Sequence, residues 1–271
     1  RGRRGAPRGT GWVLLLLAVL GALVAGRSTG WSVDASSVLS LLRPGVFVEV
    51  DGRSVAVPQP PATEGRPLPA VPVTTEGSHA FLHLTPEGRP VGYDPCRPIV
   101  YVVRADGAPG EGQALVEEAI AVVQAATGLL FVPGGATQEA PVLQRPIIQP
   151  DRYGTGWAPV LVAWSDESEV VELAGQVAGL GGSAAVPGAD GTGQWLAAGR
   201  LVLDAPDLAE MLTEPRGHER ARAIVVHELG HVLGLDHVED PGELMNPSTG
   251  RIDLGPGDLQ GLALVGDAAC Q

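Results

Sequence analysis

The stretch from His227 to His237, near the end of the chain, constrains fold and chemistry more than any other. His227 and His231 are four residues apart, so in a helix of 3.6 residues per turn both imidazoles lie on one face. Gly234 follows, and glycine readily adopts the left-handed conformation that ends a helix. The chain could then turn back and offer His237 as a third ligand. Three histidines leave one zinc position open, as in catalytic rather than structural sites.

The residues around these histidines carry a family resemblance. Glu228 directly follows the first histidine, a position that suits a general base better than a ligand. The stretch resembles the zinc signature of the metzincin peptidases, His-Glu-x-x-His-x-x-Gly-x-x-His. Residues 243–247, Glu-Leu-Met-Asn-Pro, are similar to the methionine turn of that clan, and Met245 follows His237 at a spacing similar to that of the matrixins. Chance would explain a short His-Glu-x-x-His, but it explains the whole array poorly.

The resemblance implies a fold and a set of roles. The fold is α+β, a metzincin-like zincin domain with a twisted mixed sheet of about five strands, an active-site helix, a backing helix and a C-terminal helix. His227, His231 and His237 would bind Zn²⁺, and Glu228 would take a proton from water and pass it to the leaving amine. Met245 would form a hydrophobic floor below the metal, with an ordinary core methionine as the alternative.

Other metal sites have weaker support. The histidine and aspartate cluster around the structural zinc of animal matrixins is missing, so we expect a single catalytic zinc ion. Calcium is an open but unsupported second ion, because no loop with spaced oxygen ligands is visible and the acidic residues 165–169 suit a solvated turn. His79 and His83 are four apart, but two exposed histidines in an extended segment more often bind nothing.

The net charge of the chain limits the classes of molecule that it is expected to bind. The net charge is -13, every basic residue is arginine, and four arginines precede the first apolar run with no acid before Asp34, so the remainder is more acidic still. An acidic protein is a poor partner for nucleic acid and for anionic membrane surfaces. We therefore expect no nucleic acid partner. The family resemblance implies a protein or peptide substrate, and we expect a monomer.

Residues 1–26 have the pattern of an export signal. Arginines precede an apolar run at residues 12–25, which is short for a bilayer span of roughly 20 residues. Cleavage near Gly26 would give a secreted or extracytoplasmic protein. A retained signal anchor is the alternative, and it would tether the protein to the cell surface through this run.

Residues 27–76 are expected to hold a hairpin and a linker. Alternation on both sides of Asp51-Gly52 predicts a β-hairpin over residues 46–57. The proline-rich residues 58–72 predict a semi-rigid linker. The zinc metallopeptidase domain would then span residues 77–271.

The two cysteines, Cys96 and Cys270, lie near the ends of that domain. In an exported protein they could form one disulfide, and so long a loop could contribute roughly 4 to 5 kcal/mol on the chain-entropy estimate. Alternatively, Cys96 would block the zinc as the cysteine of an inhibitory pro-segment does in many matrixins. Residues 93–98 do not match that switch motif.

Apolar patterns predict the elements around the site. Strands at residues 98–104 and 129–132 flank a helix at residues 111–127, which favours a parallel pair joined by a right-handed crossover. The other elements are expected as strands at residues 159–164 and 200–204, the active-site helix at residues 216–233, and a last helix after Asp258. Residues 181–186 are expected to be the edge strand that pairs with substrate backbone in metzincins. His218 is expected to face water.

Three functions fit these observations. The first is an exported zinc-dependent endopeptidase with Glu228 as general base. The second is a catalytically silent binding module with a zincin fold, either secreted or membrane-tethered, but its ligand set would then be expected to be broken. The third is a zinc hydrolase that acts on something other than peptides.

Overall fold

The computed structural model describes residues 45–74, 76–248 and 250–271, and Val46–Gln271 form one compact unit. The export signal expected at residues 1–26 lies outside the described residues. Within the described ranges, no helix combines the length and the apolar character that a bilayer span requires.

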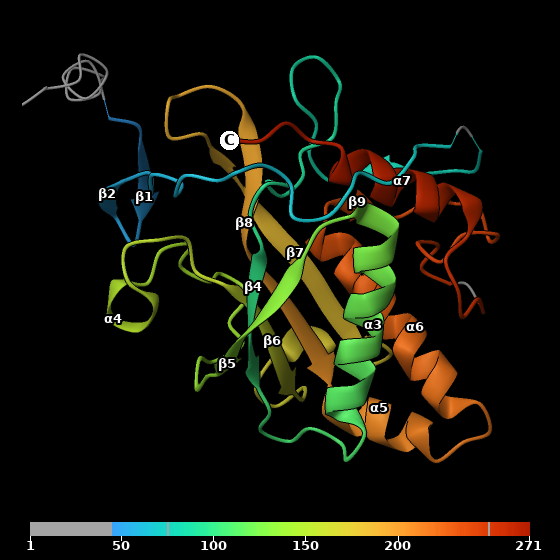
Figure 1. Ribbon diagram of the computed structural model, residues 1–271. Helices are drawn as coiled ribbons and strands as arrows, with labels where there is room; N and C mark the ends of the chain where they lie inside the picture. The colour runs from blue at the N-terminus through green and yellow to red at the C-terminus, as the bar shows by residue number, and fades with distance from the viewer. Residues whose placement is uncertain (1–44, 75, 249) are drawn as a thin grey trace, which may run out of the picture. The chain divides into compact units, whose positions relative to one another are not determined.

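The main sheet has five strands in the order β5-β4-β6-β8-β7. Strands β4 (Ile99–Arg104), β5 (Phe131–Ala136), β6 (Val160–Ser165) and β8 (Gln194–Asp204) pair in parallel. Strand β7 (Gly179–Pro187) pairs antiparallel with β8 and forms one edge. The predicted mixed sheet of an α+β fold is therefore confirmed, with the expected edge strand in place (Figure 1).

Two long helices pack against each other beside this sheet (Figure 1). Helix α3 (Gly112–Thr127) connects β4 to β5, and it ends as predicted at Gly128, whose φ is 68°. Helix α6 (Gly217–Val232) carries the first two histidines of the zinc signature. Both helices contribute apolar residues to one core with the central strands, including Leu115 and Val225, so the core fixes α6 against the sheet.

The remaining elements are short. Helix α7 (Pro256–Gly266) is the predicted C-terminal helix. Helix α5 (Ala205–Leu212) was not predicted, although the sequence holds its signals: the carboxylate of Asp204 accepts from the N–H of Asp207, and a proline occupies the first turn. The other short elements are β3 (Ala80–Phe81), α4 (Pro150–Tyr153), a 3-10 turn (Val171–Leu173) and β9 (Leu235–Asp236).

The predicted hairpin is present as β1 (Phe47–Val50) and β2 (Arg53–Ala56). Its turn residues Asp51 and Gly52 both have positive φ, 50° and 70°, as a tight two-residue hairpin turn requires.

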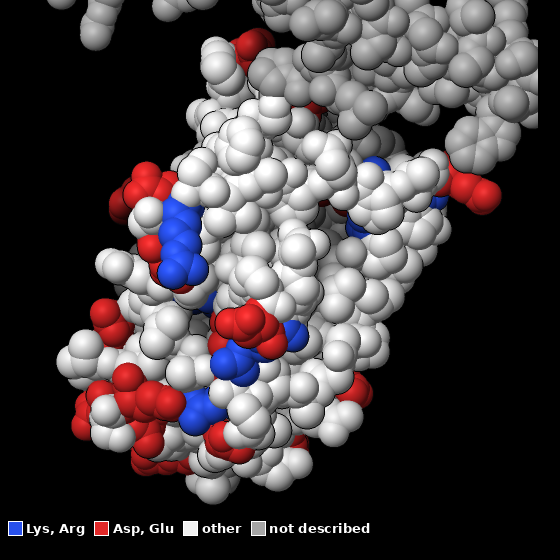
Figure 2. All heavy atoms as spheres, turned by 90° about the vertical axis from the view of Figure 1, so that its left-hand side faces the viewer, with Lys and Arg blue, Asp and Glu red and all other residues white. Residues whose placement is uncertain are grey.

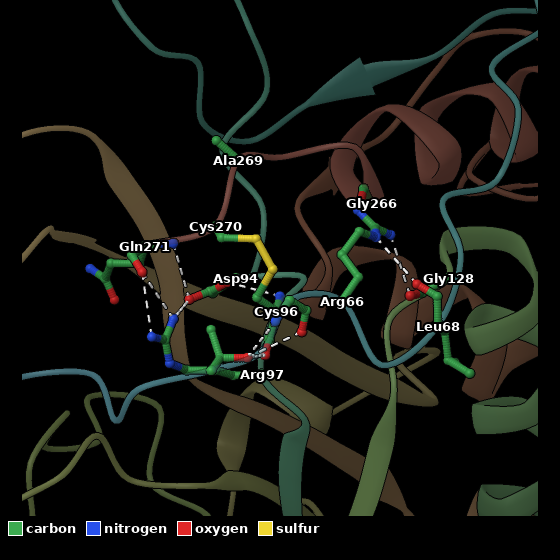
Figure 3. The surroundings of a disulfide bond; sticks show 12 residues. Arg66, Leu68, Asp94, Cys96, Arg97, Gly128, Gly266, Ala269, Cys270 and Gln271 are labelled. Carbon is green, nitrogen blue, oxygen red and sulfur yellow. Dashed lines mark hydrogen bonds and ion pairs between the residues drawn. A yellow bond between two sulfur atoms is a disulfide. The ribbon is translucent and has the colours of Figure 1, made fainter.

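The proline-rich residues 58–72, expected as a semi-rigid linker, are hydrogen-bonded to the domain that follows them. The Thr63 hydroxyl donates to the carbonyl of Cys96 at 2.8 Å. The Arg66 guanidinium donates to the carbonyl of Gly266 at 2.7 Å and to that of Gly128 at 3.4 Å (Figure 3). These carbonyls lie at the ends of α7 and α3, where a positive charge is favourable for both helices.

The cysteines form the predicted disulfide between Cys96 and Cys270, with 5.4 Å between their Cα atoms (Figure 3). Beside it, Arg97 pairs with Asp94 and donates to the carbonyl of Gln271. Because Cys96 is bonded to another sulfur, the alternative in which it blocks the zinc as a free thiolate is wrong.

His218 does not simply face water. Its ring nitrogens lie 2.7 Å from a carboxylate oxygen of Glu111 and 3.0 Å from one of Glu118. These two carboxylates raise the pKa of His218. The side chain therefore joins the start of α6 to α3 at a partly exposed position.

Figure 2 shows the face of the molecule that lies on the left in Figure 1, where α4 and the β1–β2 hairpin are found. Acidic side chains gather towards its lower end, and the basic side chains in its middle lie beside acidic ones. Among the described residues on this face there is no broad basic surface of the kind that binds nucleic acid.

Candidate metal and active site

Three histidine side chains converge at the end of α6. His227 and His231 lie one helical turn apart, and His237 follows β9. The Nε2 atom of His237 lies 3.1 Å from the Nε2 of His227 and 3.1 Å from that of His231. Two nitrogens bound at about 2.0 to 2.1 Å to a tetrahedral zinc ion are separated by about 3.3 Å, so the spacing fits one shared ion.

Hydrogen bonds to the backbone fix which ring nitrogen of the two helical histidines is free. The Nδ1–H of His227 donates to the carbonyl of Leu244 at 2.7 Å, and that of His231 donates to the carbonyl of Leu235 at 2.9 Å. Each Nε2 of a neutral ring then directs a lone pair towards the other histidines. Burial lowers the pKa of His227 to about 4 and also lowers that of His231, which favours the neutral, ligating form.

The third histidine depends on a turn and on a distant strand. Gly234 has a φ of 104°, and its N–H donates to the carbonyl of His231, so the helix ends where the sequence predicts. β9 then pairs antiparallel with β3, and the N–H of Leu82 donates to the carbonyl of Gly234. The chain leading to His237 is thus held in place by a strand from the start of the domain.

The Glu228 side chain extends from α6 towards the edge strand β7. Burial raises the pKa of its carboxyl to about 7, while a hydrogen bond from the backbone N–H of Gly181 lowers it. Strand β7 approaches closely here: a Cβ on Gly181 would lie 2.0 Å from the carbonyl oxygen of Glu228, and one on Gly179 would lie 2.8 Å from its Cγ. The two glycines therefore let the strand reach the helix at this residue.

A cleft of about 710 Å³ opens over the three histidines and Glu228. Its walls come from the start of β7, from α6 and from the segment that follows Met245. Its lining includes Leu82, Gln176, Leu180, Met211, Arg220, Ile224, Asn246, Pro247 and Arg251.

Comparison with known proteins agrees with this geometry. The family model described as Matrixin matches residues 172–263, which include β7, β8, α6, the three histidines and residues 243–247. This part of the chain is therefore similar to the matrixin family. The triad of His227, His231 and His237 falls within the matched residues, and its ring nitrogens lie close enough together to hold one metal ion.

One curated relative also matches a short part of the chain. Macrophage metalloelastase of Oryctolagus cuniculus is 61% identical over 31 residues, which are 11% of this chain and 7% of that protein. The matched part thus spans a small share of that relative's length.

Two solved structures also have some similarity to this chain. The GM1-bound form of the ECX AB5 holotoxin has 14% identity and a TM-score of 0.35, with 63% of this chain and 82% of that chain covered. High choriolytic enzyme 1, a hatching enzyme zinc-protease from Oryzias latipes, has 18% identity and a TM-score of 0.24, with 58% and 50% covered. At these TM-scores neither structure bears on the fold of this chain.

Met245 lies against α6 and is 2% exposed. A Cβ on Gly230 of α6 would lie 2.7 Å from its sulfur, so any larger residue would require the methionine side chain to shift. The carboxylate of Asp258 accepts from the backbone N–H groups of Leu244, Met245 and Gly255. It thereby fixes the turn whose Leu244 carbonyl holds His227.

Sequence reasoning missed the roles of Asp258 and of its neighbour Glu243. The Glu243 carboxylate accepts from the N–H groups of Gly257 and Asp258 at 2.9 and 3.1 Å, so it caps the start of α7. The acid in the first turn of α7 was visible as a helix-entry signal. Its contact with the methionine turn, which lies more than ten residues earlier in the chain, was not visible in the sequence.

Outside the triad, the described residues offer another cluster of three potential ligands, formed by Asp94, Cys96 and Cys270. Both of these cysteines are held in the disulfide, so they present no thiolate to a metal. His79 and His83 do not share a cluster among the described residues, and His79 packs edge-on against Phe81.

Proposed function

We propose that this protein is an exported, zinc-dependent endopeptidase in which Glu228 is the general base. The observation that carries the proposal is the convergence of three histidine Nε2 atoms beside the partly buried carboxyl of Glu228, in a cleft bordered by an edge strand. We place the metallopeptidase domain at residues 77–271, because the sheet, β3 and α6 all lie within it.

The residues divide the chemistry between them. A zinc ion bound by the triad would supply Lewis acidity, which polarises a peptide carbonyl and makes water easier to deprotonate. Glu228, with a pKa raised to about 7, accepts a proton from water and gives it to the leaving amine at near-neutral pH. The buried Met245 side chain would form a hydrophobic floor below the three histidines, so that their rings cannot move towards the core.

The edge strand suits a peptide substrate. β7 pairs with β8 on one side only, which leaves backbone N–H and C=O groups of its other side for an extended chain. Its glycines and alanines, such as Gly182 and Ala184, present little side-chain bulk to that chain. We therefore propose proteins or peptides in extended conformation as substrates.

Two observations support export. The Cys96–Cys270 disulfide is of a kind that persists in oxidising compartments and is rare in the cytosol. The arginines and the apolar run at residues 1–26 have the composition of a signal peptide or signal anchor. We propose a secreted or extracytoplasmic location on both grounds.

The test replaces the base and keeps the metal site. Glu228→Gln should bind one zinc ion per chain and lose about 10² to 10⁴-fold in kcat for an unfolded protein substrate, because general-base catalysis contributes that much. The matched control is Glu87→Gln, since Glu87 is exposed in a distant turn and should leave kcat unchanged. Zinc content is measured by elemental analysis and cleavage by mass spectrometry.

The same experiment separates the competing functions. Wild-type cleavage by Glu228→Gln would refute the role of Glu228. A wild-type protein that holds zinc but cuts nothing in a peptide library would instead indicate a silent zincin-fold binding module. Turnover of esters or simple amides alone would indicate a zinc hydrolase with another substrate.

A further inference from the structure

Ser183 lies at an irregularity in the edge strand. Gly182 of β7 pairs with Arg200 of β8, whereas Ala184 pairs with Ala197, so Ser183 alone faces two residues of the partner strand. One of these two, Ala198, has a φ of 51°, which is unusual for a residue other than glycine. Such bulges re-aim side chains and are frequent beside active sites.

The Ser183 side chain joins the edge strand to the end of α6. Its Oγ lies 2.7 Å from the carbonyl oxygen of Val232, the last residue of the helix. That carbonyl is among those that have no acceptor role inside the helix. A carbonyl can only accept, so the single hydroxyl hydrogen of Ser183 is used in this bond.

The direction of the next hydrogen bond follows from that assignment. Tyr93 Oη lies 2.8 Å from Ser183 Oγ, and the serine has no second hydrogen to give, so Tyr93 donates. Burial raises the pKa of Tyr93 to about 12, which keeps the phenol protonated as the donor. A Cβ on Gly199 would lie 2.5 Å from Tyr93 Oη and 2.6 Å from Ser183 Oγ, so the strand backbone encloses this pair.

The bulge is also held from elsewhere in the chain. The Arg145 guanidinium donates to the carbonyl of Gly199 at 2.9 Å. Arg145 is itself buried and forms a two-pronged ion pair with Glu139, at 2.6 and 2.9 Å. A fixed loop therefore sets the backbone that encloses Ser183.

Ser183 shares its face of β7 with the residues that contact Glu228. Side chains two apart in a strand point the same way, so Gly179, Gly181 and Ser183 all face α6. The glycines contact Glu228, and Ser183 binds Val232 one helical turn later. The strand and the helix are thus fastened at two points on either side of the second zinc ligand.

We propose that Ser183, oriented by Tyr93, is a positioning residue that sets the register between the substrate-binding edge strand and the helix that carries Glu228 and two zinc ligands. This inference rests on the proposed peptidase function and deepens it. It assigns to one hydroxyl the alignment of a bound peptide with the reacting groups, without any contact between that hydroxyl and the peptide.

The test compares Ser183→Ala with Ser183→Thr, because threonine keeps a hydroxyl that can donate to Val232. Ser183→Ala should retain one zinc ion per chain and lose about tenfold in kcat/KM for an extended peptide, with the loss mainly in kcat. Ser183→Thr should stay within about twofold of wild type. Ser168→Ala is the matched control, since Ser168 bonds only locally to Asp166 on an exposed turn.

A role confined to stability would give a different result, in which Ser183→Ala melts at a lower temperature but keeps the wild-type kcat below its melting range. That result, or an equal loss in Ser183→Ala and Ser183→Thr, would overturn the proposal.

Hydrogen exchange keeps the proposal testable if the wild-type protein cuts no peptide, an outcome that refutes the proposed function separately. Faster exchange of the β7 amides in Ser183→Ala than in Ser183→Thr supports the register role, and equal exchange refutes it.

Discussion

Helices α3 and α6 pack side by side against the same core, but they are used differently. The inner face of α3 is continuously apolar, and its buried residues include Leu115, Ala119 and Val123. α6 has a comparable buried stripe and adds His227, Glu228 and His231 along the cleft. A helix can carry a catalytic site on one side when its other side packs as an ordinary core helix does.

The two helices also differ in what supports them. α3 ends in its own glycine cap, and sequence-local signals account for it. The active side of α6 depends on carbonyls and N–H groups from Leu235, Leu244 and β7, which are supplied by other segments. We therefore expect changes in α3 to affect stability alone, and changes around α6 to affect zinc binding and turnover as well.

The largest effect on stability is expected in α3. Leu115→Ala should lower the free energy of unfolding by about 2 to 5 kcal/mol, because Leu115 is fully buried and a cavity would remain. Zinc content and kcat of the folded fraction should not change. Thermal unfolding, zinc analysis and peptide cleavage measure the three quantities. Leu259→Ala, on the exposed side of α7, is the control and should cost less than about 0.5 kcal/mol. A loss of zinc in Leu115→Ala would contradict the division between the helices.

Asp258→Asn should show the contrasting behaviour. The amide loses charge-assisted hydrogen bonds to three backbone N–H groups, so stability should fall by about 2 to 3 kcal/mol. Zinc affinity should also fall by about 10 to 100-fold, because the turn that orients His227 loosens. Competition with a zinc chelator measures the affinity. Asp253→Asn, an exposed acid in a surface ion pair, should leave it unchanged. Unchanged zinc affinity in Asp258→Asn would show that residues 243–247 keep their conformation without the hydrogen bonds to Asp258.

Relief of backbone strain in the β8 bulge should change the free energy of unfolding by about 1 kcal/mol, whereas the end of α3 has no such strain to relieve. The left-handed position at the end of α3 is a glycine, Gly128, whereas that in the β8 bulge is Ala198. Ala198→Gly should raise stability by about 1 kcal/mol, since glycine adopts this conformation without the side-chain penalty. Gly128→Ala should destabilise, because its Cβ would lie 2.3 Å from the carbonyl oxygen of Pro69. Denaturant unfolding of both variants decides, and a destabilised Ala198→Gly would indicate that the bulge is unstrained.

The smallest effect concerns the contact between the helices at His218. Glu118 and Glu111 raise the pKa of His218, so its stabilising contribution is complete below the unfolded pKa of about 6.5 and is lost as pH rises through the folded value. His218→Gln should therefore cost less than about 1 kcal/mol at pH 6, after solvent screening, and less still at pH 9. Unfolding curves at both pH values test this, and a cost that grows with pH would exclude the ion-pair explanation.

The sequence predicted what is local or periodic. The helices α3 and α6, the strands β4 and β6, and the spacing of the three ligands follow from apolar repeats and from glycine positions. The mixed five-stranded sheet and the edge position of β7 agree with expectations drawn from family resemblance, whereas the order of the strands was not predicted.

Distant pairings were not predictable in the same way. The brace of β9 by β3, the bond from Asp258 to the methionine turn, and the Tyr93–Ser183–Val232 chain each join residues far apart in the sequence. Each uses a common residue type without a spacing signature. Because such contacts depend on the assembled core, only the fold reveals them.

The disulfide has a topological consequence. Cys96 and Cys270 are 174 residues apart, so the bond closes a covalent ring that contains the whole five-stranded sheet and all three zinc ligands. One proteolytic nick anywhere within the ring would leave the two fragments attached to each other. β1, β2 and β3 precede Cys96 and lie outside the ring, so a nick between β3 and Cys96 would leave them held by non-covalent contacts alone. The parts of a nicked ring would separate on a gel only after reduction.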